Sequence, residues 1–229
     1  MSETPSSGGL LGVPVSRSVQ IPSGPAFDPV RRALAAIDAV HGDGMLPRLP
    51  VVLTRAATEA GAYEWNDRTG EALRLRLSSL GGHPEFTVVH EIGHFLDHQA
   101  LGRPGTYASE TGGCAGVMAA IDRSAAIEAL RALRGRQFRL VQERRRRIAV
   151  RVRQSFVEYH LLPRERFARA YAQFIAVSSH DSELLKQRDA VRLSESGAVY
   201  HVHWDDEDFR PIHEQFDRLF RRLRWMISQ

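Results

Sequence analysis

The sequence has a single cysteine, Cys114, and it has no long apolar run. One cysteine excludes a disulfide within the chain, and it also excludes a zinc site built from several thiolates. The lack of disulfides weakly favours a reducing compartment. Because every apolar stretch is well short of the roughly 20 residues that a membrane-spanning helix needs, we expect no membrane segment.

The N-terminus also lacks the features of a secretory signal. Its first residues, MSETPSSGGLLGVPVS, contain no basic segment followed by a long apolar one. We therefore expect a cytoplasmic protein, and delivery into another cell stays open as an alternative. Residues 1–24 are rich in Ser, Gly and Pro, which predicts a flexible leader with little structure.

The rest of the composition is that of a globular protein. Hydrophobic residues make up 43% and charged residues 25% of the 229 residues, so we expect residues 25–229 to form one domain. The net charge is only +4, but the arginines cluster, and Arg144–Arg147 form an unbroken run. Such a run is typical of a phosphate-binding surface, of a surface for an acidic protein, or of a solvated helix face.

Apolar spacing in the first half of the chain predicts helices and strands in alternation. Leu73, Leu75 and Leu77 alternate with arginines, as they do in a strand with one buried face. The expected elements are a helix over 28–41, a strand over 49–54, a hairpin of 62–65 with 72–78, and a helix over 84–101.

The second half has mainly helical spacing. Residues 103–117 are expected to form a loop, and residues 197–204 a strand. Residues 148–153 are compatible with either a strand or part of a helix. The expected helices are 121–134, 137–158, one beginning at 163, 181–190, and a last one beginning at 205.

The segment His90-Glu91-Ile92-Gly93-His94 lies in the middle of the helix predicted over 84–101. Positions i and i+4 share one helix face, so the imidazoles of His90 and His94 can bind one metal ion. Glu91 is rotated by about 100 degrees and can reach a water on that metal. This is the arrangement of H-E-x-x-H zinc sites, in which the glutamate acts as the base. The alternative is a chance match on an amphipathic helix.

A catalytic zinc needs a third protein ligand. Ala100 stands six residues after the second histidine, which excludes a ligand at that spacing. We favour Glu165, because Ala168 and Ala172 follow it at helical spacing and would let its helix approach the motif helix closely. The alternative for Glu165 is a surface ion pair with Arg169.

Four further polar residues are weaker candidates. Asp97 can orient a ligating imidazole, and His98 lies one turn beyond His94, although both are also ordinary residues near a helix end. His201 and His203 would share one face of the predicted strand. They would either line the site or be incidental.

Two spaced segments resemble a known family. HEIGHFLDH (90–98) and PRERFARAYAQF (163–174) resemble the gluzincin-like zincins carried by phages and other mobile elements. Those proteins have an HE-x-GH-x-LDH helix and a later E-x-FARA helix, and the resemblance covers about residues 50–175. It implies that the glutamate of the second motif, Glu165, is the third zinc ligand.

A related resemblance is to the ImmA/IrrE group, which cleaves transcriptional repressors. The shared pattern H-E-x-x-H-x-x-x-H is met by His90, Glu91, His94 and His98. The chain departs from that group around the third ligand, and it has no evident DNA-binding segment. Repressor cleavage is therefore one substrate class among several.

These resemblances imply an α+β, zincin-like fold with a small twisted sheet, an active-site helix and a mostly helical C-terminal half. They imply a Zn²⁺-dependent metallopeptidase that acts on a protein or peptide substrate. In zincins the substrate lies along a sheet edge, and the matching segment is 72–78. A tyrosine or histidine stabilises the oxyanion in such sites, and we expect Tyr159 in that role, with His160 and Tyr171 as alternatives.

The rival hypothesis is a basic module that binds nucleic acid or protein, with a structural or vestigial metal site. The run Arg144–Arg147 favours it. Glu91 argues against it, because a structural zinc site needs no base. A protease that serves as an effector in another cell is a third possibility with the same motif.

Overall fold

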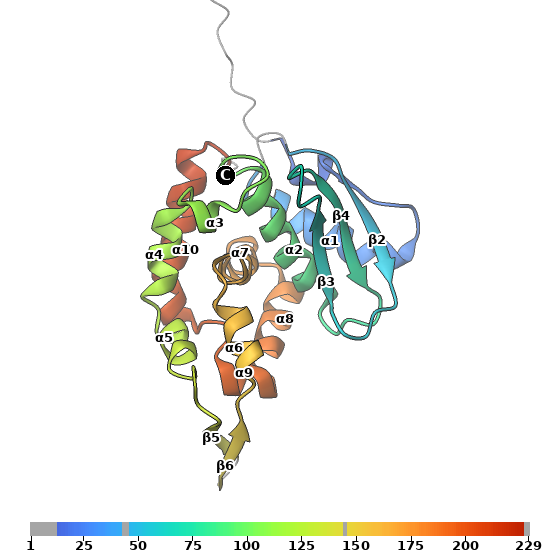
Figure 1. Cartoon of the computed structure of the whole chain (residues 1–229). Helices are drawn as coiled ribbons and strands as arrows, with labels where there is room; N and C mark the ends of the chain where they lie inside the picture. The colour runs from blue at the N-terminus through green and yellow to red at the C-terminus, as the bar shows by residue number, and fades with distance from the viewer. Residues whose placement is uncertain (1–12, 43–45, 144–145, 227–229) are drawn as a thin grey trace, which may run out of the picture.

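A four-stranded sheet lies on one side of the molecule, and helices with a second, two-stranded sheet form the other side (Figure 1). The computed structural model describes residues 13–42, 46–143 and 146–226. The predicted mixture of helix and strand, with a small sheet and a mostly helical C-terminal half, is confirmed. None of the helices in the described part is long and apolar enough to cross a membrane.

The main sheet has the strand order β1-β2-β4-β3. β1, β2 and β4 run parallel to their neighbours, whereas β3 runs antiparallel to β4. The prediction that residues 72–78 form the edge strand is wrong, because β4 pairs with a strand on each side and β3 lies at the edge. The strands are β1 (Val19–Gln20), β2 (Leu49–Thr54), β3 (Gly61–Trp65) and β4 (Ala72–Ser78).

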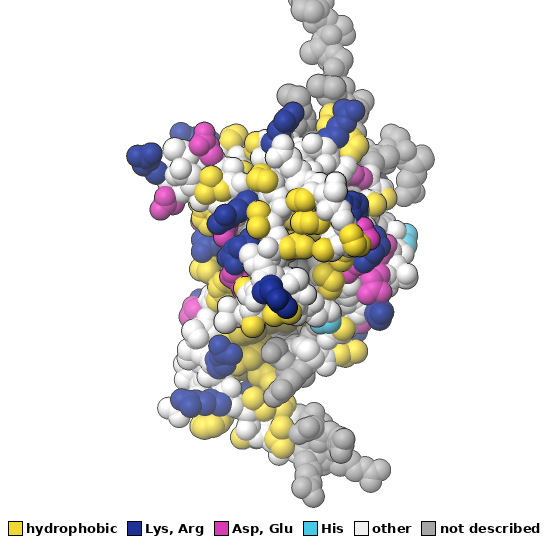
Figure 2. All heavy atoms as spheres, turned by 90° about the vertical axis from the view of Figure 1, so that its right-hand side faces the viewer, with side chains coloured by type: hydrophobic (Ala, Val, Ile, Leu, Met, Phe, Trp, Pro, Cys, Tyr) yellow, Lys and Arg dark blue, Asp and Glu magenta, His cyan; other side chains and the backbone are white. Residues whose placement is uncertain are grey.

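The two faces of β4 differ as its alternating sequence predicts. Leu75 and Leu77 are buried on the face that packs against the helices. On the opposite face Glu64 receives one hydrogen bond from Nε of Arg74 at 2.6 Å and one from Nε of Arg76 at 2.7 Å. Charged pairs thus share the sheet face that no helix covers with exposed hydrophobic side chains (Figure 2).

The N-terminal part of the described chain belongs to the folded body. Residues 1–12 of the predicted leader lie outside the described residues. In residues 13–24, however, Val15 and Val19 are buried, and β1 pairs with β2. The apolar side chains of this short stretch extend the core beyond the predicted boundary at residue 25.

Ten α-helices and two short 3₁₀ helices occur in the described residues. Prolines stand in the first turn of three of the α-helices, where a missing N–H breaks no helical hydrogen bond. The 3₁₀ helices are η1 (Val15–Arg17) and η2 (Pro25–Phe27). The α-helices are α1 (Asp28–Asp38), α2 (Pro84–Gln99), α3 (Ala108–Thr111), α4 (Ala115–Asp122), α5 (Ala125–Arg131), α6 (Gln154–Leu161), α7 (Pro163–Ser179), α8 (Ser182–Leu193), α9 (Glu195–Tyr200) and α10 (Asp206–Arg222).

The helix predicted over 137–158 is wrong in its first two thirds. That stretch forms a second, two-stranded sheet of β5 (Phe138–Glu143) and β6 (Arg146–Arg151). The alternative strand over 148–153 is therefore confirmed in most of its length. Val141 and Val150, one from each strand, pack against the core, which favours an extended conformation for both segments.

The strand predicted over 197–204 is also wrong. Ser194 caps α9 by accepting a hydrogen bond from the backbone N–H of Gly197, which starts a short helix. His201 ends it in the left-handed region, with φ of 49°. His201 and His203 therefore do not share a strand face.

Two other boundaries differ from the prediction. The loop predicted over 103–117 contains α3 and the start of α4, and the helix predicted over 121–134 is two helices. Ser124 separates them, because its hydroxyl accepts a hydrogen bond from the N–H of Ile127 and so caps α5.

Helix α7 lies in the middle of the helical half and is seen nearly end-on in Figure 1, with α2 between it and the sheet. The two helices pack closely where Gly93 of α2 faces Ala168 and Tyr171 of α7, and both of these residues are fully buried. Ala168, one of the two small residues predicted to permit this approach, lies in the contact between α2 and α7. The close packing brings the two sequence motifs together.

Replacing Gly93 by alanine is expected to lower the free energy of unfolding by about 1–3 kcal/mol, the usual cost of overpacking a core. The new Cβ would lie 2.9 Å from Cδ1 of Tyr171 and 3.1 Å from Cα of Ala168. Gly116→Ala in α4 is the matched control, because its Cβ would meet only the flexible side chain of Gln215. Urea denaturation of both variants measures the difference. Equal stability would contradict the close packing.

Candidate metal centre

Two neighbouring helices bring three potential ligands together. His90 and His94 come from one face of α2, and Glu165 comes from the first turn of α7. The Nε2 atoms of the two histidines are 3.2 Å apart. The Glu165 carboxylate lies 3.6 Å from Nε2 of His90 and 3.3 Å from Nε2 of His94. All three predicted ligands thus meet at one point, and the group could bind a metal ion.

The spacing of these atoms suits a small tetrahedral ion. Ligand atoms about 2.0–2.2 Å from a tetrahedral zinc are about 3.3–3.6 Å from one another. The observed separations of 3.3 and 3.6 Å fall within that range, and the third, 3.2 Å, is 0.1 Å below it. The side chain of His90 is 20% exposed, whereas those of His94 and Glu165 are below 10%. His90 is therefore the most exposed of the three residues.

The charge state of Glu165 also suits a ligand. Burial raises the pKa of this carboxyl, but the hydrogen bonds from His90 and His94 outweigh that effect and hold its pKa well below the usual range. The carboxylate is therefore ionised at neutral pH. Metal ligands have to be deprotonated, so no proton needs to leave Glu165 before a cation binds.

Glu91 lies beside the three residues and is fixed by β3. Its Oε2 accepts a hydrogen bond from the backbone N–H of Tyr63 at 2.9 Å. Burial raises the pKa of Glu91 to about 7. A Cβ on Gly61 would lie 3.0 Å from Cγ of Glu91, so this glycine lets the edge strand approach the helix. Sequence spacing identifies Glu91, but the support from β3 depends on the fold.

The two alternative ligands in α2 lie in other networks. Asp97 accepts hydrogen bonds from the N–H and the hydroxyl of Ser109, and it thereby ties α3 to α2. Burial raises the pKa of Asp97 to about 6. His98 contacts the Tyr63 hydroxyl through Nδ1 at 2.9 Å. Nδ1 of His94 is buried and has no hydrogen-bond partner in the described part, so Asp97 does not orient it.

Among the three predicted oxyanion-stabilising residues, Tyr159 has the most suitable place. It extends from α6 and lines the cavities on both sides of the metal group. Burial and the charge of Glu165 raise the pKa of its phenol, which therefore stays protonated. His160 lines only one of these cavities, and its Nδ1 contacts the carbonyl of Phe156 at 2.9 Å. Tyr171 is buried in the core, where its hydroxyl contacts Nε2 of His41 at 2.8 Å.

A cleft passes the metal group and has a cavity at each end. Both cavities are bordered by Glu59, Gly61, Glu91 and Tyr159. The His94-side cavity has a volume of about 220 Å³, and its other lining residues include Tyr63, Trp65, Tyr107 and Arg164. The His90-side cavity has a volume of about 660 Å³, and its other lining residues include Phe86, Phe156, Val202 and His203.

Several of these lining residues had no signal in the sequence. Tyr107 lies in a segment predicted as a loop, and Phe86 resembles any apolar residue of an amphipathic helix. His203 has an exposed fraction of 7%, and its buried Nδ1 has no partner among the described residues. It reaches the cavity from the turn after α9 and not from a strand. Only the three-dimensional fold brings these residues to one cleft.

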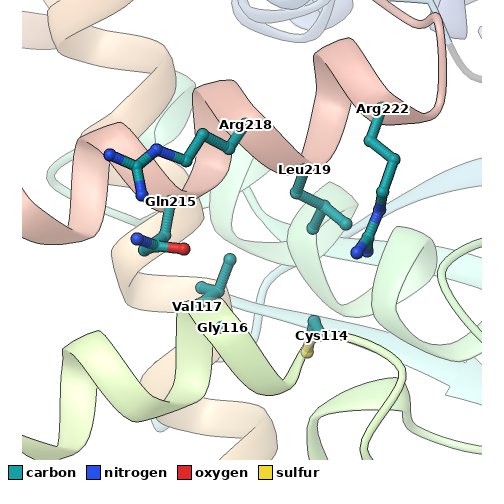
Figure 3. Close-up of a pocket in the computed structure, with 7 residues that line it drawn as sticks. All are labelled: Cys114, Gly116, Val117, Gln215, Arg218, Leu219 and Arg222. Atoms are coloured by element: carbon teal, nitrogen blue, oxygen red, sulfur yellow. The ribbon is translucent and has the colours of Figure 1, made fainter.

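A further cavity of about 230 Å³ lies between α4 and α10, apart from the metal group (Figure 3). Cys114 borders it, but the thiol is buried, and burial raises its pKa. A thiol in that state is a poor nucleophile. Arg218 and Arg222 also line this cavity, but an arginine is protonated at neutral pH and cannot act as a base. It therefore lacks the groups for catalysis.

No protein-family model matches the chain, and no curated protein or solved structure is significantly similar to it. The resemblance to gluzincin-like zincins therefore depends on the two sequence motifs alone.

Proposed function

We propose that the chain is a zinc-dependent metallopeptidase with a zincin-like active site, which hydrolyses peptide bonds in a protein or peptide substrate. The supporting observation is the convergence of His90, His94 and Glu165 beside a buried carboxyl, Glu91. Two imidazoles and one carboxylate are ligands that zinc accepts, and three protein ligands leave one position open. An open position is the property that distinguishes catalytic zinc sites from structural ones.

Zinc at this site would lower the pKa of water and polarise the scissile carbonyl. Glu91 takes the proton of the attacking water and later gives it to the leaving amine. A pKa of about 7 serves both transfers, because the group is a usable base and a usable acid near neutral pH. The N–H of Tyr63 holds one carboxyl oxygen in place and keeps the side chain oriented.

Tyr159 is the proposed oxyanion donor. Its phenol borders both cavities and stays protonated next to Glu165. A protonated phenol can donate a hydrogen bond to the oxygen on which negative charge develops. The neighbouring Arg169 is buried and donates to the backbone carbonyls of Val202 and His160, so it fixes the cavity wall and does not bind substrate itself.

The edge strand β3 is the proposed place of the substrate backbone. β3 lies at the edge of the sheet, and its residues Gly61 and Tyr63 border the cleft. A peptide in extended conformation can add to such an edge through main-chain hydrogen bonds. Its alternate side chains would then reach the cavities on either side of the metal group.

The direct test is digestion of an unfolded protein, such as carboxymethylated casein, by the zinc-loaded chain. New peptide termini are expected in mass spectra. They should disappear when 1,10-phenanthroline removes the metal and return when zinc is added in excess. The Glu91→Gln variant is the control for contaminating proteases. New termini that persist with the chelator, or in that variant, would refute the proposal.

A further inference from the structure

The β5–β6 hairpin, residues 138–151, projects from the end of the helical half that lies farthest from the C-terminus (Figure 1). Its two strands pair only with each other among the described residues. Leu140 faces Ala149 across the pair, and Val141 faces Ile148. Because paired residues of an antiparallel ladder share a face, the hairpin has two faces of different composition.

One face has several contacts within the protein, although Ile148 on it is 37% exposed. Val141 and Val150 pack against the core. Arg139 donates to the carbonyl of Val199 and contacts Nε2 of His201. This inner face fixes the hairpin on the body of the molecule. It also removes Arg139 from the arginines that a partner can reach.

The outer face combines exposed apolar side chains with cations. Phe138 is 58% exposed and Leu140 is 65% exposed. Arg147 and Arg151, which project from the same face, are also exposed. Figure 2 shows basic and hydrophobic side chains next to one another at this lower end of the molecule. No ion pair of Arg147 or Arg151 occurs within the described ranges.

Glu143 of β5 lies on the other face of the pair, opposite Arg146, and an acid that follows β6 in the chain is already paired. The Glu158 carboxylate of α6 accepts two hydrogen bonds from the guanidinium of Arg134, from Nε at 3.0 Å and from Nη2 at 2.9 Å. Arg153, just after β6, is exposed as well. Arg144 and Arg145, from the arginine run, lie outside the described residues. The outer face therefore has a positive charge that lacks a counterion within the described chain.

The hairpin is continuous with the wall of the active-site cleft. Val152, the residue after β6, is buried, and the N–H of Arg153 donates to the Tyr200 hydroxyl at 3.0 Å. α6 begins at the next residue and carries Phe156 and Tyr159 into the His90-side cavity. A polypeptide that leaves this cavity along α6 would reach the base of the hairpin.

We propose that the outer face of the β5–β6 hairpin docks an extended segment of the protein substrate in which acidic and apolar residues follow one another at every second position. In an extended segment every second side chain points to one side, so such a segment presents its acidic and its apolar side chains to the same face. The apolar ones can lie on Phe138 and Leu140. Carboxylates would then meet Arg147 and Arg151. The outer strand edges of the hairpin supply main-chain donors and acceptors for such a segment.

This inference rests on the proposed peptidase function, because the docked segment belongs to the molecule that the metal site cleaves. The apolar half of the face favours a polypeptide over a nucleic acid, since Leu140 offers nothing to a phosphate backbone. Docking at the hairpin also gives a role to a basic surface that lies outside the cleft of the metal group. It would select long acidic substrates by raising their local concentration at the cleft.

Fluorescence anisotropy tests the docking without any cleavage. The probe is a fluorescein-labelled extended peptide in which glutamate and leucine take turns at every second position, with threonine between them. The matched control peptide has lysine in place of glutamate. The parent chain should bind the acidic probe and not the basic one. The double variant R147E/R151E should bind at least about tenfold more weakly, because each change replaces an attraction by a repulsion. R48E/R55E, which changes two exposed arginines beside β2, should bind like the parent.

The apolar side chains of the outer face, Phe138 and Leu140, are tested by a second pair of double variants. Phe138→Ser with Leu140→Ser should also weaken binding, whereas Val52→Ser with Leu73→Ser, two exposed residues of the main sheet, should not. Hairpin variants that bind like the parent would overturn the proposal. Tighter binding of a duplex DNA than of the acidic probe, lost in R147E/R151E, would also overturn it and assign the arginines to nucleic acid.

A cleavage assay separates this inference from the peptidase proposal. A short fluorogenic peptide is compared with the same peptide extended by the acidic segment. Hairpin variants should raise KM for the extended peptide alone and leave kcat and the short peptide unchanged. Binding of the acidic probe without cleavage of either peptide would refute the peptidase function and keep the docking site. Cleavage that is equal in all variants would refute the docking site alone.

Discussion

Replacing Glu91 by glutamine is expected to lower kcat for peptide hydrolysis by about 10²–10⁴-fold, the usual contribution of a general acid–base group. Glutamine has nearly the same shape and still accepts the hydrogen bond from the N–H of Tyr63. It cannot take a proton from water. Because Glu91 is not one of the three ligands, the zinc affinity should stay close to that of the parent.

Glu59→Gln is the matched control for this variant. Glu59 borders the same two cavities, but its side chain is 43% exposed and its carboxylate is paired with Arg76, so it is not a candidate base. Steady-state kinetics with a fluorogenic peptide, together with the zinc content of each protein, measures the effect. A Glu91→Gln variant with the parent's kcat would exclude Glu91 as the base. If Glu59→Gln lowers kcat as much as Glu91→Gln does, the effect comes from the loss of a negative charge in the cleft and not from the loss of a proton acceptor.

Replacing Glu165 by alanine should weaken zinc binding at least about 100-fold, since removal of groups that merely support a ligand already costs about 10–100-fold. Only the two imidazoles of α2 would remain to hold the ion. The carboxylate is also fully ionised in the parent, so its removal deletes the sole negative charge among the three ligands. Competition with a chromophoric chelator gives both dissociation constants.

Glu158→Ala is the control for the loss of a carboxylate near α7. Glu158 lies on the surface of α6 and is paired with Arg134, so its variant should keep the zinc affinity of the parent. If Glu165→Ala binds zinc as tightly as the parent, Glu165 is not a ligand and the packing of α7 on α2 has another purpose. Circular dichroism of the apo proteins verifies that the change leaves the fold intact.

The parts of the site that lie within one helix can be predicted from the sequence. His90, Glu91 and His94 have fixed relative positions as soon as the helix over 84–99 is recognised, because helical spacing sets their directions. Glu165 was predictable from a second motif and from small residues at helical spacing, among which Ala168 does contact α2. Strong periodicity likewise predicted β2, β3 and β4.

Features that depend on distant contacts could not be predicted in this way. The segment 137–158 has arginines and apolar residues that suit either a helix or a hairpin, and the packing of Val141 and Val150 on the core decides between them. The order of strands in the sheet is equally non-local, which is why the edge strand was assigned to β4 and not to β3. Alternation over 197–204 indicated a strand, but the cap at Ser194 starts a helix.

The most direct measurement is a zinc titration of the chelator-treated chain, with bound zinc and the rate of peptide cleavage recorded on the same samples. The proposed site predicts that both quantities rise together and reach their plateaus at one zinc per chain. Cleavage in the absence of bound zinc, or a full complement of zinc without cleavage of any peptide offered, would contradict a catalytic zinc at His90, His94 and Glu165.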